Sequence, residues 1–364
     1  MSAAIAPDDI VATHADVAPD AREPLLVLEP LAAFLDEHGI GSGEIRAQPI
    51  GDGHSNVTYL IERESAEVVL RRPPRGPLPP SAHDVLREAR LLRALEGTPA
   101  RAPKVLAVGD DETVIGCPFY VMERVPGEVI VWQTPPTLDT PEQRRRIGEE
   151  LIDALVEIHA VDWRAAGLEG FGKPTGYLER QLRRFSGLWE HNRTRELPEM
   201  ERVARWLGEH LPDPDPPTPA TIVHGDYRVG NAIFAAQPPA QLVAVLDWEM
   251  ATIGDPLADI GYMCMFWTEA EDPAEGLRAA LGNVTRAEGY PTRAELIARY
   301  EQASKRSMTD LRWYVTLALW KSAVFMEGNY KRAIAGSTDD PYLKAFGEGV
   351  AQLARQAEGV ARGE

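Results

Sequence analysis

The sequence predicts an α+β protein with two lobes, in which the first lobe is a mainly antiparallel sheet with one flanking helix and the second is mostly helical. Between residues 45 and 122, short β-branched and apolar runs alternate with turns rich in Gly and Pro. From residue 141 onward, apolar residues recur instead at the three- to four-residue spacing of helices. With 364 residues, of which 44% are hydrophobic, the chain can bury a large core and fill two lobes.

The net charge and the cysteine content limit which binding partners and which cellular compartment are expected for this protein. The net charge is -18 and the pI is ≈ 5.0, so neither nucleic acid nor an anionic membrane is expected as the main partner. The two cysteines, Cys117 and Cys264, lie in apolar settings, which argues against a disulfide framework and indicates a cytoplasmic protein. The most apolar stretch, residues 313–326, is too short to span a bilayer and contains Lys321.

The chain is expected to divide into three parts. Residues 1–24 read as a flexible acidic tail, because they lack the cationic start and the long apolar core of a signal peptide. Residues 25–123 are expected to form the first lobe and residues 124–364 the second. A Pro-rich stretch, residues 211–220, leads into the most informative part of the second lobe.

The first lobe is expected to begin with a helix over Leu25–Glu37 that ends at Gly39. Strands are predicted at Ile45–Ile50, Val57–Ile61, Val68–Arg72, Val105–Val108 and Phe119–Met122. A helix from Ala82 to Leu95, which Ser81 can cap, is expected after the third strand.

The second lobe is expected to begin with a well-marked helix. Thr140 can cap it, Pro141 suits its first turn, and Gln143 can complete a capping box. His159, near the end of its apolar face, reads as a packed core residue. Two further helices are expected within residues 177–206, one over 293–304 and one over 311–333, whose aromatic side chains read as core although some could line a pocket.

The stretch from Thr221 to Asp255 contains the candidate catalytic and metal-binding residues. A polar turn is followed by two short apolar runs, residues 232–235 and 242–246, and this spacing indicates a small hairpin. A hairpin folds the chain back on itself, so it can place Asn231 near Asp247. One amide oxygen and one carboxylate are hard oxygen donors of the kind that suits Mg²⁺. Asp226 lies five positions before Asn231 and can share the site without being the same ligand.

These residues resemble a known family. Protein kinases carry H-R-D-L-x-x-x-N and then the Asp of D-F-G. Here His224, Asp226 and Asn231 keep that spacing, Gly225 replaces the Arg, and Asp247-Trp248-Glu249 stands in the place of D-F-G. The pattern HGD…N…DW is similar to that of the aminoglycoside phosphotransferase family of kinase-like enzymes. HGDYRVGN with LDWEMATIGDPLADI most resembles the subgroup that includes the kinase-like domain fused to some acyl-CoA dehydrogenases, and the resemblance runs from about Leu28 to the C-terminus.

The resemblance implies a protein-kinase-like fold and a role for each residue of the motif. Asp226 would be the catalytic base that accepts the proton of a substrate hydroxyl. Asn231 and Asp247 would hold Mg²⁺ on the phosphates of a nucleotide. Arg228 stands two positions after Asp226, where protein kinases place a Lys near the transferred phosphate.

Other residues of this stretch receive supporting roles. In the family the motif histidine, here His224, usually braces the loop. Asp255 and Asp259 are expected to brace the loop first and to act in catalysis second. Glu249 lies near enough to Asp247 in the sequence to be an additional metal or water partner.

In the first lobe, the stretch Gly51 to Asn56 lies between two predicted strands. Such a turn is ordinarily only a hairpin. With the downstream motif present, it is also expected to contact nucleotide phosphates, with Ser55 and Asn56 as the polar contributors.

The third predicted strand ends in two arginines where kinases place the phosphate-gripping Lys. Arg71 is the expected counterpart and Glu88, on the following helix, its expected partner. The alternatives are that Arg71 and Arg72 both face solvent on an edge strand and that Glu88 is a solvated surface residue. The stretch Met122 to Gly127, with Glu123 as its site residue, is expected to link the lobes and to meet the adenine edge through its backbone.

The sequence as a whole predicts a phosphotransferase that uses ATP and Mg²⁺, with a nucleotide-binding first lobe and a catalytic, substrate-binding second lobe. The acceptor is expected to be a hydroxyl of a small molecule, either aminoglycoside-like or a hydroxy acid or hydroxyacyl thioester. Polar candidates for the acceptor pocket lie on the last helices: Lys321, Glu327, Asn329 and Arg332. The alternative is a nucleotide-binding pseudokinase with a regulatory role, which the Arg at the usual Lys position favours.

Overall fold

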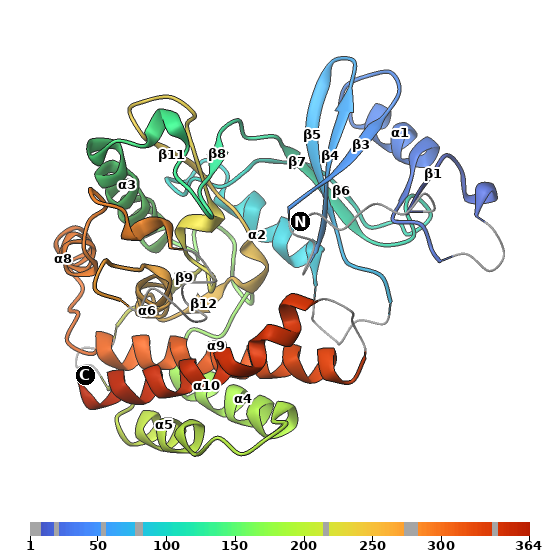
Figure 1. The fold of residues 1–364 in the computed structure, drawn as a ribbon. Helices are drawn as coiled ribbons and strands as arrows, with labels where there is room; N and C mark the ends of the chain where they lie inside the picture. The colour runs from blue at the N-terminus through green and yellow to red at the C-terminus, as the bar shows by residue number, and fades with distance from the viewer. Residues whose placement is uncertain are drawn as a thin grey trace. The chain divides into compact units, whose positions relative to one another are not determined.

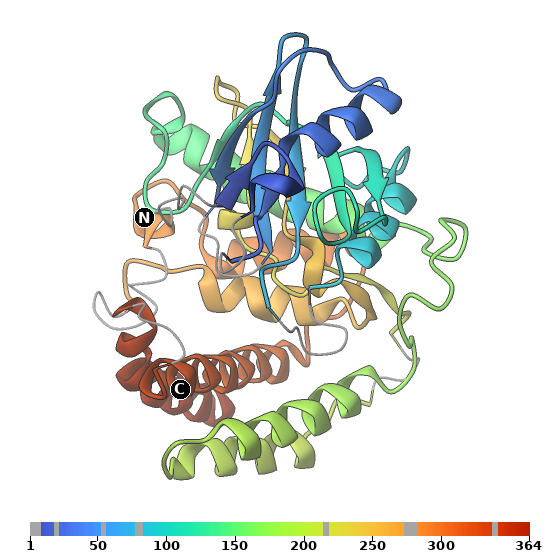
Figure 2. The ribbon, with the colours of Figure 1, turned by 90° about the vertical axis from the view of Figure 1, so that its right-hand side faces the viewer.

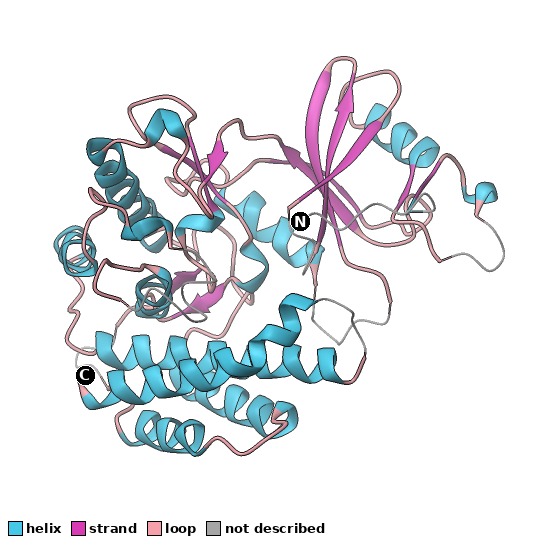
Figure 3. Ribbon diagram, viewed as in Figure 1, coloured by secondary structure: helices cyan, strands magenta, loops and turns pink. Residues whose placement is uncertain are grey.

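The computed structural model describes residues 9–17, 22–51, 56–76, 83–213, 218–272, 283–336 and 341–364. The chain forms two compact units: Met1–Thr98 with Ala102–Pro126, and Pro99–Arg101 with Gly127–Glu364. Strands dominate the first unit and helices the second (Figure 3), so the predicted α+β class is confirmed.

The first unit is built on a five-stranded antiparallel sheet with the strand order β3-β4-β5-β7-β6 (Figure 1). Its strands are β3 (Arg46–Ile50), β4 (Val57–Arg63), β5 (Ala66–Arg72), β6 (Val105–Gly109) and β7 (Phe119–Glu123). β5 is the central strand. The helix α2 (Val85–Leu95) packs against β6 and β7. It is capped by Asp84, whose side chain accepts from the N–H of Arg87 at 2.9 Å, whereas the predicted cap, Ser81, lies outside the described residues.

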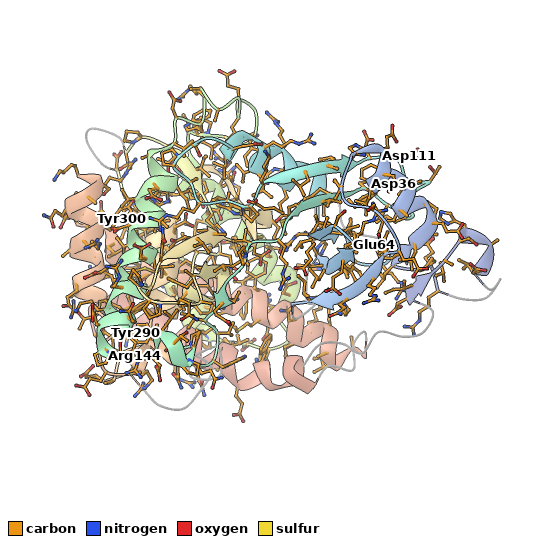
Figure 4. All side chains as sticks on the ribbon, turned by 90° about the horizontal axis from the view of Figure 1, so that it is seen from above. Asp36, Glu64, Asp111, Arg144, Tyr290 and Tyr300 are labelled. Atoms are coloured by element: carbon orange, nitrogen blue, oxygen red, sulfur yellow. The ribbon has the colours of Figure 1, made fainter. Side chains whose placement is uncertain are left out.

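The helix α1 (Leu28–Glu37) covers part of the hydrophobic core of this sheet through its buried leucines. Arg63 at the end of β4 ties the helix to the sheet, since its Nη2 lies 2.6 Å from Oδ1 of Asp36, a residue labelled in Figure 4. Within the segment predicted as a tail, β1 (Ile10–Val11) pairs in parallel with β2 (Leu26–Val27), and the short 3₁₀ helix η2 (His14–Asp16) follows β1.

The second unit is mainly helical. Its described helices are α3 (Pro141–Ala160), α4 (Tyr177–Asn192), α5 (Pro198–Glu209), α6 (Leu257–Phe266), α8 (Arg293–Ser304), α9 (Leu311–Ile334) and α10 (Pro341–Arg362). α9 and α10 lie side by side along most of their length, next to α4 and α5 (Figure 2). Trp313, Tyr314 and Trp320 of α9 are buried, as expected of a core face, whereas Phe325 is 43% exposed.

The start of α3 is as predicted, because Thr140 caps it by accepting from the N–H of Gln143 at 3.3 Å. The prediction that Gln143 completes a capping box is wrong, however. The side-chain oxygen of Gln143 instead accepts from the N–H of Ala240 at 2.6 Å, which ties the helix to a distant turn.

Short strands complete the second unit: β8 (Glu128–Val129), β9 (Thr221–Val223), β10 (Ala232–Phe234), β11 (Leu242–Val245) and β12 (Thr252–Gly254). Short 3₁₀ helices lie between some of them: η3 (Pro136–Leu138), η4 (Val229–Asn231), η5 (Trp248–Met250) and, later in the chain, η6 (Val284–Arg286). The predicted hairpin is present as β10 and β11, which pair antiparallel with Ala232 opposite Val245. β12 pairs antiparallel with β9. None of the described helices is long and apolar enough to cross a bilayer.

Candidate active site

The turn that follows β9, His224 to Asp226, has no room for a side chain at its centre. Gly225 has a φ of +87°, and a Cβ placed there would lie 2.9 Å from the carbonyl oxygen of Met250. Any L-residue would therefore meet both backbone strain and a backbone atom that cannot shift easily. This is the physical reason for a glycine where protein kinases carry Arg.

Asp259, in the first turn of α6, holds this turn through its backbone. Its buried carboxylate accepts from the N–H of His224 at 2.7 Å and from the N–H of Gly225 at 2.8 Å. Hydrogen bonds from backbone N–H groups to a carboxylate are among the stronger ones in proteins. Asp255 lies nearby and accepts from the hydroxyl of Tyr314 at 2.7 Å, and burial raises its pKa. These contacts are those of bracing residues.

A buried chain of side chains continues from Asp259. Nε2 of His159 lies 3.1 Å from the Asp259 carboxylate, and Nδ1 lies 2.6 Å from the hydroxyl of Tyr300, which Figure 4 labels on α8. A carboxylate can only accept, so Nε2 carries the proton and the Tyr300 hydroxyl donates to Nδ1. Burial lowers the pKa of His159, although the Asp259 carboxylate opposes this shift. His159 is thus a packed, hydrogen-bonded core residue, as the sequence predicts.

The imidazole of His224 links the turn to the end of the hairpin. Its Nε2 lies 2.9 Å from the carbonyl oxygen of Leu246, and its Nδ1 accepts from the N–H of Asp226 at 3.2 Å. Because a carbonyl only accepts and an amide N–H only donates, the ring is neutral with its proton on Nε2. The ring centre also lies 4.7 Å from that of Trp248. His224 therefore braces both Asp226 and the residue that precedes Asp247.

The two carboxylate oxygens of Asp226 have different surroundings. Oδ2 accepts from Nδ2 of Asn231 at 2.8 Å, and the same amide group donates to the backbone carbonyl of Asp226, also at 2.8 Å. Oδ1 is buried, and no donor among the described residues is hydrogen-bonded to it. Nε of Arg228 lies 3.6 Å from Oδ1, an ion-pair distance that is too long for a hydrogen bond. A buried carboxylate oxygen without a hydrogen-bond donor is unusual in a folded protein.

Asn231 and Asp247 stand at the two ends of the hairpin. The N–H of Leu246 donates to the backbone carbonyl of Asn231 at 2.8 Å, which joins these ends directly. Because the Nδ2 of Asn231 faces the backbone carbonyl of Asp226, its Oδ1 faces away from that contact. Asp247 has a left-handed backbone, with φ at 65°, so the chain reverses at the residue that carries the carboxylate. An amide oxygen and a carboxylate are ligands of the kind that a hard cation prefers.

Arg228 and Tyr262 complete the surroundings of Asp226. The guanidinium of Arg228 lies over the ring of Phe266, 5.3 Å from its centre. The pKa of Tyr262 is raised well above its ordinary value, first by burial, then by the negative charge of Asp226 and by the interaction of the Tyr262 hydroxyl with that carboxylate. Tyr262 follows Asp259 by three residues on α6, and neither periodicity nor a motif identifies it from the sequence.

In the first unit, Arg71 and Glu88 form a buried ion pair. Nε of Arg71 lies 3.0 Å from Oε2 of Glu88, and their side chains are 12% and 2% exposed. The predicted pairing is confirmed. The alternative of a solvated Glu88 is wrong, because α2 packs this carboxylate against the sheet.

The edge-strand alternative for the two arginines is also wrong, because β5 is central in the sheet. Successive side chains of a strand point to opposite faces, so Arg72 extends away from Arg71. It is buried and donates to backbone carbonyls, among them that of Pro73 at 3.0 Å and that of Leu25. Arg72 therefore has a structural role, and Arg71 is the arginine that faces α2.

The other residues predicted to bind the nucleotide fall into three cases. Asn56 is buried, and its Oδ1 lies 3.1 Å from Nδ1 of His83, next to the start of α2. Ser55 lies outside the described residues. The carboxylate and the N–H of Glu123 both bond to the backbone of Lys104, each at 2.9 Å, so this side chain is engaged within its own sheet.

Within the second unit, the residues predicted to line the acceptor pocket differ in their burial and in their hydrogen-bond partners. Glu327 is fully buried and accepts from the hydroxyl of Thr194 at 2.7 Å and from Nη2 of Arg195 at 2.9 Å, so it is structural. Arg332 donates to Asn329, three residues earlier on the surface of α9. Lys321 lies beside α4, where its Nζ is 3.1 Å from Oε1 of Gln181.

One turn and one hairpin thus contain a buried carboxylate oxygen without a hydrogen-bond donor, a guanidinium, an amide oxygen and a second carboxylate: Asp226, Arg228, Asn231 and Asp247. Comparison with known proteins identifies the family to which the chain belongs. The sequence profile of the phosphotransferase enzyme family (APH) matches residues 46–296. The chain belongs to this family.

Relatives of this phosphotransferase family member include multidomain proteins. It is 35% identical over 332 residues to mouse acyl-CoA dehydrogenase family member 10, a match that covers 89% of the chain and 30% of that protein. It is 31% identical to human acyl-CoA dehydrogenase family member 11, over 86% of the chain and 41% of that protein. The chain thus spans less than half the length of these relatives.

Solved structures show the same fold. A candidate aminoglycoside phosphotransferase from Ralstonia eutropha is 30% identical, with a TM-score of 0.77 over 92% of this chain and 98% of that one. Aminoglycoside 2'-phosphotransferase-IIIa in complex with GDP has a TM-score of 0.59 at 16% identity, over 90% and 96% of the two chains. A complex of APH(2")-IIa with streptomycin and ATP has a TM-score of 0.53 at 17% identity, over 94% and 99%. The fold is therefore the two-lobed, kinase-like α+β fold that the sequence predicts.

Proposed function

We propose that this protein transfers the γ-phosphoryl group of ATP to a hydroxyl of a small molecule. The bond between the γ-phosphorus and the β-γ bridging oxygen breaks, and a bond forms between that phosphorus and the acceptor oxygen. ADP leaves, and the proton of the acceptor hydroxyl passes to Asp226. Such a transfer needs an oriented nucleophile and charge stabilisation, and little covalent chemistry from the protein.

The observation that carries this proposal is the unfilled oxygen of Asp226. Its Oδ1 is buried, ionisable and without a donor among the described residues, while Oδ2 is held by Asn231 at 2.8 Å. An acceptor hydroxyl that donated to Oδ1 would be aligned by a carboxylate that cannot rotate freely. This is the geometry required of a general base.

Charge is offset by residues of the same turn and hairpin. Arg228, 3.6 Å from Oδ1 of Asp226, would stabilise negative charge on the transferring phosphoryl group. Mg²⁺, when bound, would neutralise charge on the nucleotide phosphates, and the oxygens of Asn231 and Asp247 suit it. No cluster of three or more His, Cys, Asp or Glu occurs among the described residues, which accords with an ion that takes few protein ligands.

Nucleotide binding is assigned to the first unit. We propose that Arg71, held by Glu88, contacts the nucleotide phosphates, that Ser55 and Asn56 contribute from the preceding turn, and that the link around Glu123 meets the base through its backbone. Relatives of this fold are known with ATP and with GDP. ATP is our choice, and a direct comparison with GTP tests it.

The acceptor is proposed as a small molecule that bears an alcohol. The solved relatives act on aminoglycosides or macrolides by name, whereas the multidomain relatives are named as acyl-CoA dehydrogenases. A hydroxy acid or hydroxyacyl acceptor is therefore a second candidate beside an aminoglycoside. We place the reaction in the cytoplasm, where free thiols such as Cys117 and Cys264 persist.

The rival proposal is a pseudokinase that binds nucleotide without transfer. Arg71 in place of the usual Lys favours it, since Arg presents a planar fork rather than a point charge. The free oxygen of Asp226 opposes it, because a protein that only binds nucleotide has no need of an oriented base.

The deciding experiment measures ADP release from Mg-ATP across a panel of alcohols, with wild type and Asp226→Asn. The Asn variant can keep the bond from Asn231 but presents an NH₂ donor where Oδ1 accepts. Transfer should fall by about 10²- to 10⁴-fold, the usual contribution of a general base. Thermal stabilisation by Mg-ATP should remain. Asp213→Asn, at an exposed carboxylate in the same unit, is the matched control.

ADP release that is the same in wild type and Asp226→Asn would leave the pseudokinase as the better account. Loss of both ADP release and Mg-ATP binding in Asp226→Asn would show that the residue binds nucleotide rather than serving as the base.

A further inference from the structure

A cavity of about 430 Å³ lies in the second unit, apart from the residues assigned to the phosphoryl-transfer chemistry. Its walls come from the segment that leads into α4, from α4 itself and from β12. Four of its lining residues are cationic: Lys173, Arg180, Arg183 and Arg184. The whole chain carries a net charge of -18, so this cationic lining contrasts with the overall acidity of the chain.

The four cations of the cavity wall form no close ion pair among the described residues, although Asp255 and Asp259 act on the lining residue Tyr177 from a longer distance. Among the described residues, the ion pairs include none that joins Lys173, Arg180, Arg183 or Arg184 to an Asp or Glu. Arg180 donates to the backbone carbonyls of Lys173 and Thr175, which orders the guanidinium but leaves its charge in place. Glu179 is the one acidic residue between positions 173 and 184. Unneutralised cations around a cavity attract an anion.

An aromatic surface adjoins the cationic wall. Phe185 of α4 and Phe325 of α9 meet edge to face, with ring centres 5.2 Å apart, and Phe325 is 43% exposed. Nζ of Lys321 lies 4.6 Å from the centre of the Phe185 ring and bonds to Gln181, a lining residue. A fifth cation and an exposed aromatic ring therefore border the site, and a ligand with an apolar portion can use both.

The cavity adjoins the strand pair that leads into the catalytic turn. Thr252 lines the cavity, and in the pairing of β12 with β9 it stands opposite Val223, the residue before His224. Two residues earlier, the carbonyl of Met250 lies against Gly225. A ligand in the cavity is thus separated from the turn of Asp226 by one pair of short strands.

We propose that this cavity binds the anionic end of the acceptor, a carboxylate or phosphate attached to an apolar portion. The proposal rests on the proposed phosphotransferase function and adds the chemical class of its acceptor. Lys173, Arg180, Arg183 and Arg184 receive the anion. The exposed ring of Phe325, which packs on the buried Phe185, receives the apolar portion. A polycationic aminoglycoside is disfavoured here, because each ammonium group would meet an arginine or a lysine.

The test is calorimetric binding of amphiphilic probes without nucleotide. The anionic probes are 3-hydroxydecanoate and decyl phosphate, the neutral probe is decane-1,3-diol, and the cationic probe is tobramycin. At least one anionic probe should bind ten-fold or more tightly than the diol, and the two anions separate a carboxylate ligand from a phosphate ligand. Arg183→Glu combined with Arg184→Glu should weaken that binding at least ten-fold.

The matched control is Arg205→Glu combined with Arg355→Glu. These two arginines are exposed, lie on α5 and α10, and change the net charge by the same amount. The control pair should leave binding of the anion within about two-fold of wild type, since long-range charge effects are screened in salt. Both double variants replace exposed side chains, and their thermal unfolding should stay close to that of wild type.

The proposal is overturned if neither anion binds in the millimolar range, if both double variants weaken binding equally, or if tobramycin binds most tightly. Its failure is separable from failure of the phosphotransferase. Anion binding that depends on Arg183 and Arg184, without ADP release, would retain the site and reject the reaction. ADP release with an acceptor that is insensitive to the Arg183 and Arg184 changes would retain the reaction and reject the site.

Discussion

Nε of Arg71 lies 3.0 Å from Oε2 of Glu88, and both side chains are largely removed from solvent. The arginine comes from the central strand of the sheet and the glutamate from α2, so one ion pair fixes the direction of a cation on β5. Removal of one partner breaks a buried ion pair, which is costly.

We therefore expect Glu88→Gln to lower the free energy of unfolding by about 3 kcal/mol, measured by urea denaturation. The double variant Arg71→Met, Glu88→Met should recover most of that stability but bind Mg-ATP poorly, which separates the structural role of the pair from its nucleotide role. The control is Glu67→Gln, on the same strand. Its ion pair with Arg124 is about half exposed on both sides and should contribute less than about 1 kcal/mol. Equal costs for Glu88→Gln and Glu67→Gln would contradict this account.

Replacement of Asp247 by Asn tests whether this residue binds Mg²⁺. Its left-handed φ of 65° is one that Asn also tolerates, so Asp247→Asn removes the charge with little backbone cost. We expect the Mg²⁺ concentration needed for half of the thermal stabilisation by ATP to rise at least ten-fold, because a neutral amide is a weaker ligand than a carboxylate. Asp213→Asn serves again as the control. An unchanged Mg²⁺ titration would remove Asp247 from the metal site.

His159 should make the protein sensitive to acid. Burial lowers its pKa below the ordinary 6.5, so in acid the unfolded chain binds a proton that the folded chain does not. The free energy of unfolding should therefore fall as the pH drops below about 6.5, by up to about 1.4 kcal/mol per pH unit from this residue. Asp259 and Tyr300 face the ring, and Arg306 also acts on it.

The measurement is urea denaturation at pH 7.5 and pH 5.5. His159→Gln should lose stability overall but depend less on pH than wild type. The exposed His210, replaced by Gln, should keep the wild-type dependence. The same pH dependence in His159→Gln as in wild type would assign the acid sensitivity to other groups.

Lys321 should give the anion site a pH dependence. Burial, and next the charge of Arg184, lower its pKa to about 8, with Asp259 acting in the opposite direction. The ammonium group therefore loses its charge as the pH rises through about 8, whereas a carboxylate ligand stays ionised. Binding of 3-hydroxydecanoate should therefore weaken between pH 7 and pH 9.5.

Replacement of Lys321 by Gln should weaken anion binding at pH 7 and leave it nearly independent of pH. The control variant Lys331→Gln, near the C-terminal end of the same helix, should bind the anion as wild type does. A Lys321→Gln variant with the wild-type pH profile would show that another group controls binding.

Local sequence was enough to predict the five strands of the main sheet and several helices, but not β1 or α10. The hairpin of β10 and β11 follows from two apolar runs and a turn, and the start of α3 follows from Thr140 and Pro141. Such features depend on residues within about ten positions of one another, and this is the range over which periodicity and capping act. The spacing of Asp226, Asn231 and Asp247 then indicated the family and the chemistry.

Tertiary structure decided which side chains are buried or paired where the sequence left alternatives open. Arg71 and Arg72 are neighbours in the sequence, yet one meets Glu88 and the other is buried among backbone carbonyls, because β5 became a central strand. The family resemblance predicted that Asp259 braces the turn at Gly225. The joining of the basic wall of α4 with Lys321 of α9 was not predicted, and it brings together residues far apart in the chain. Such contacts arise from packing between elements, and no local pattern in the sequence encodes them.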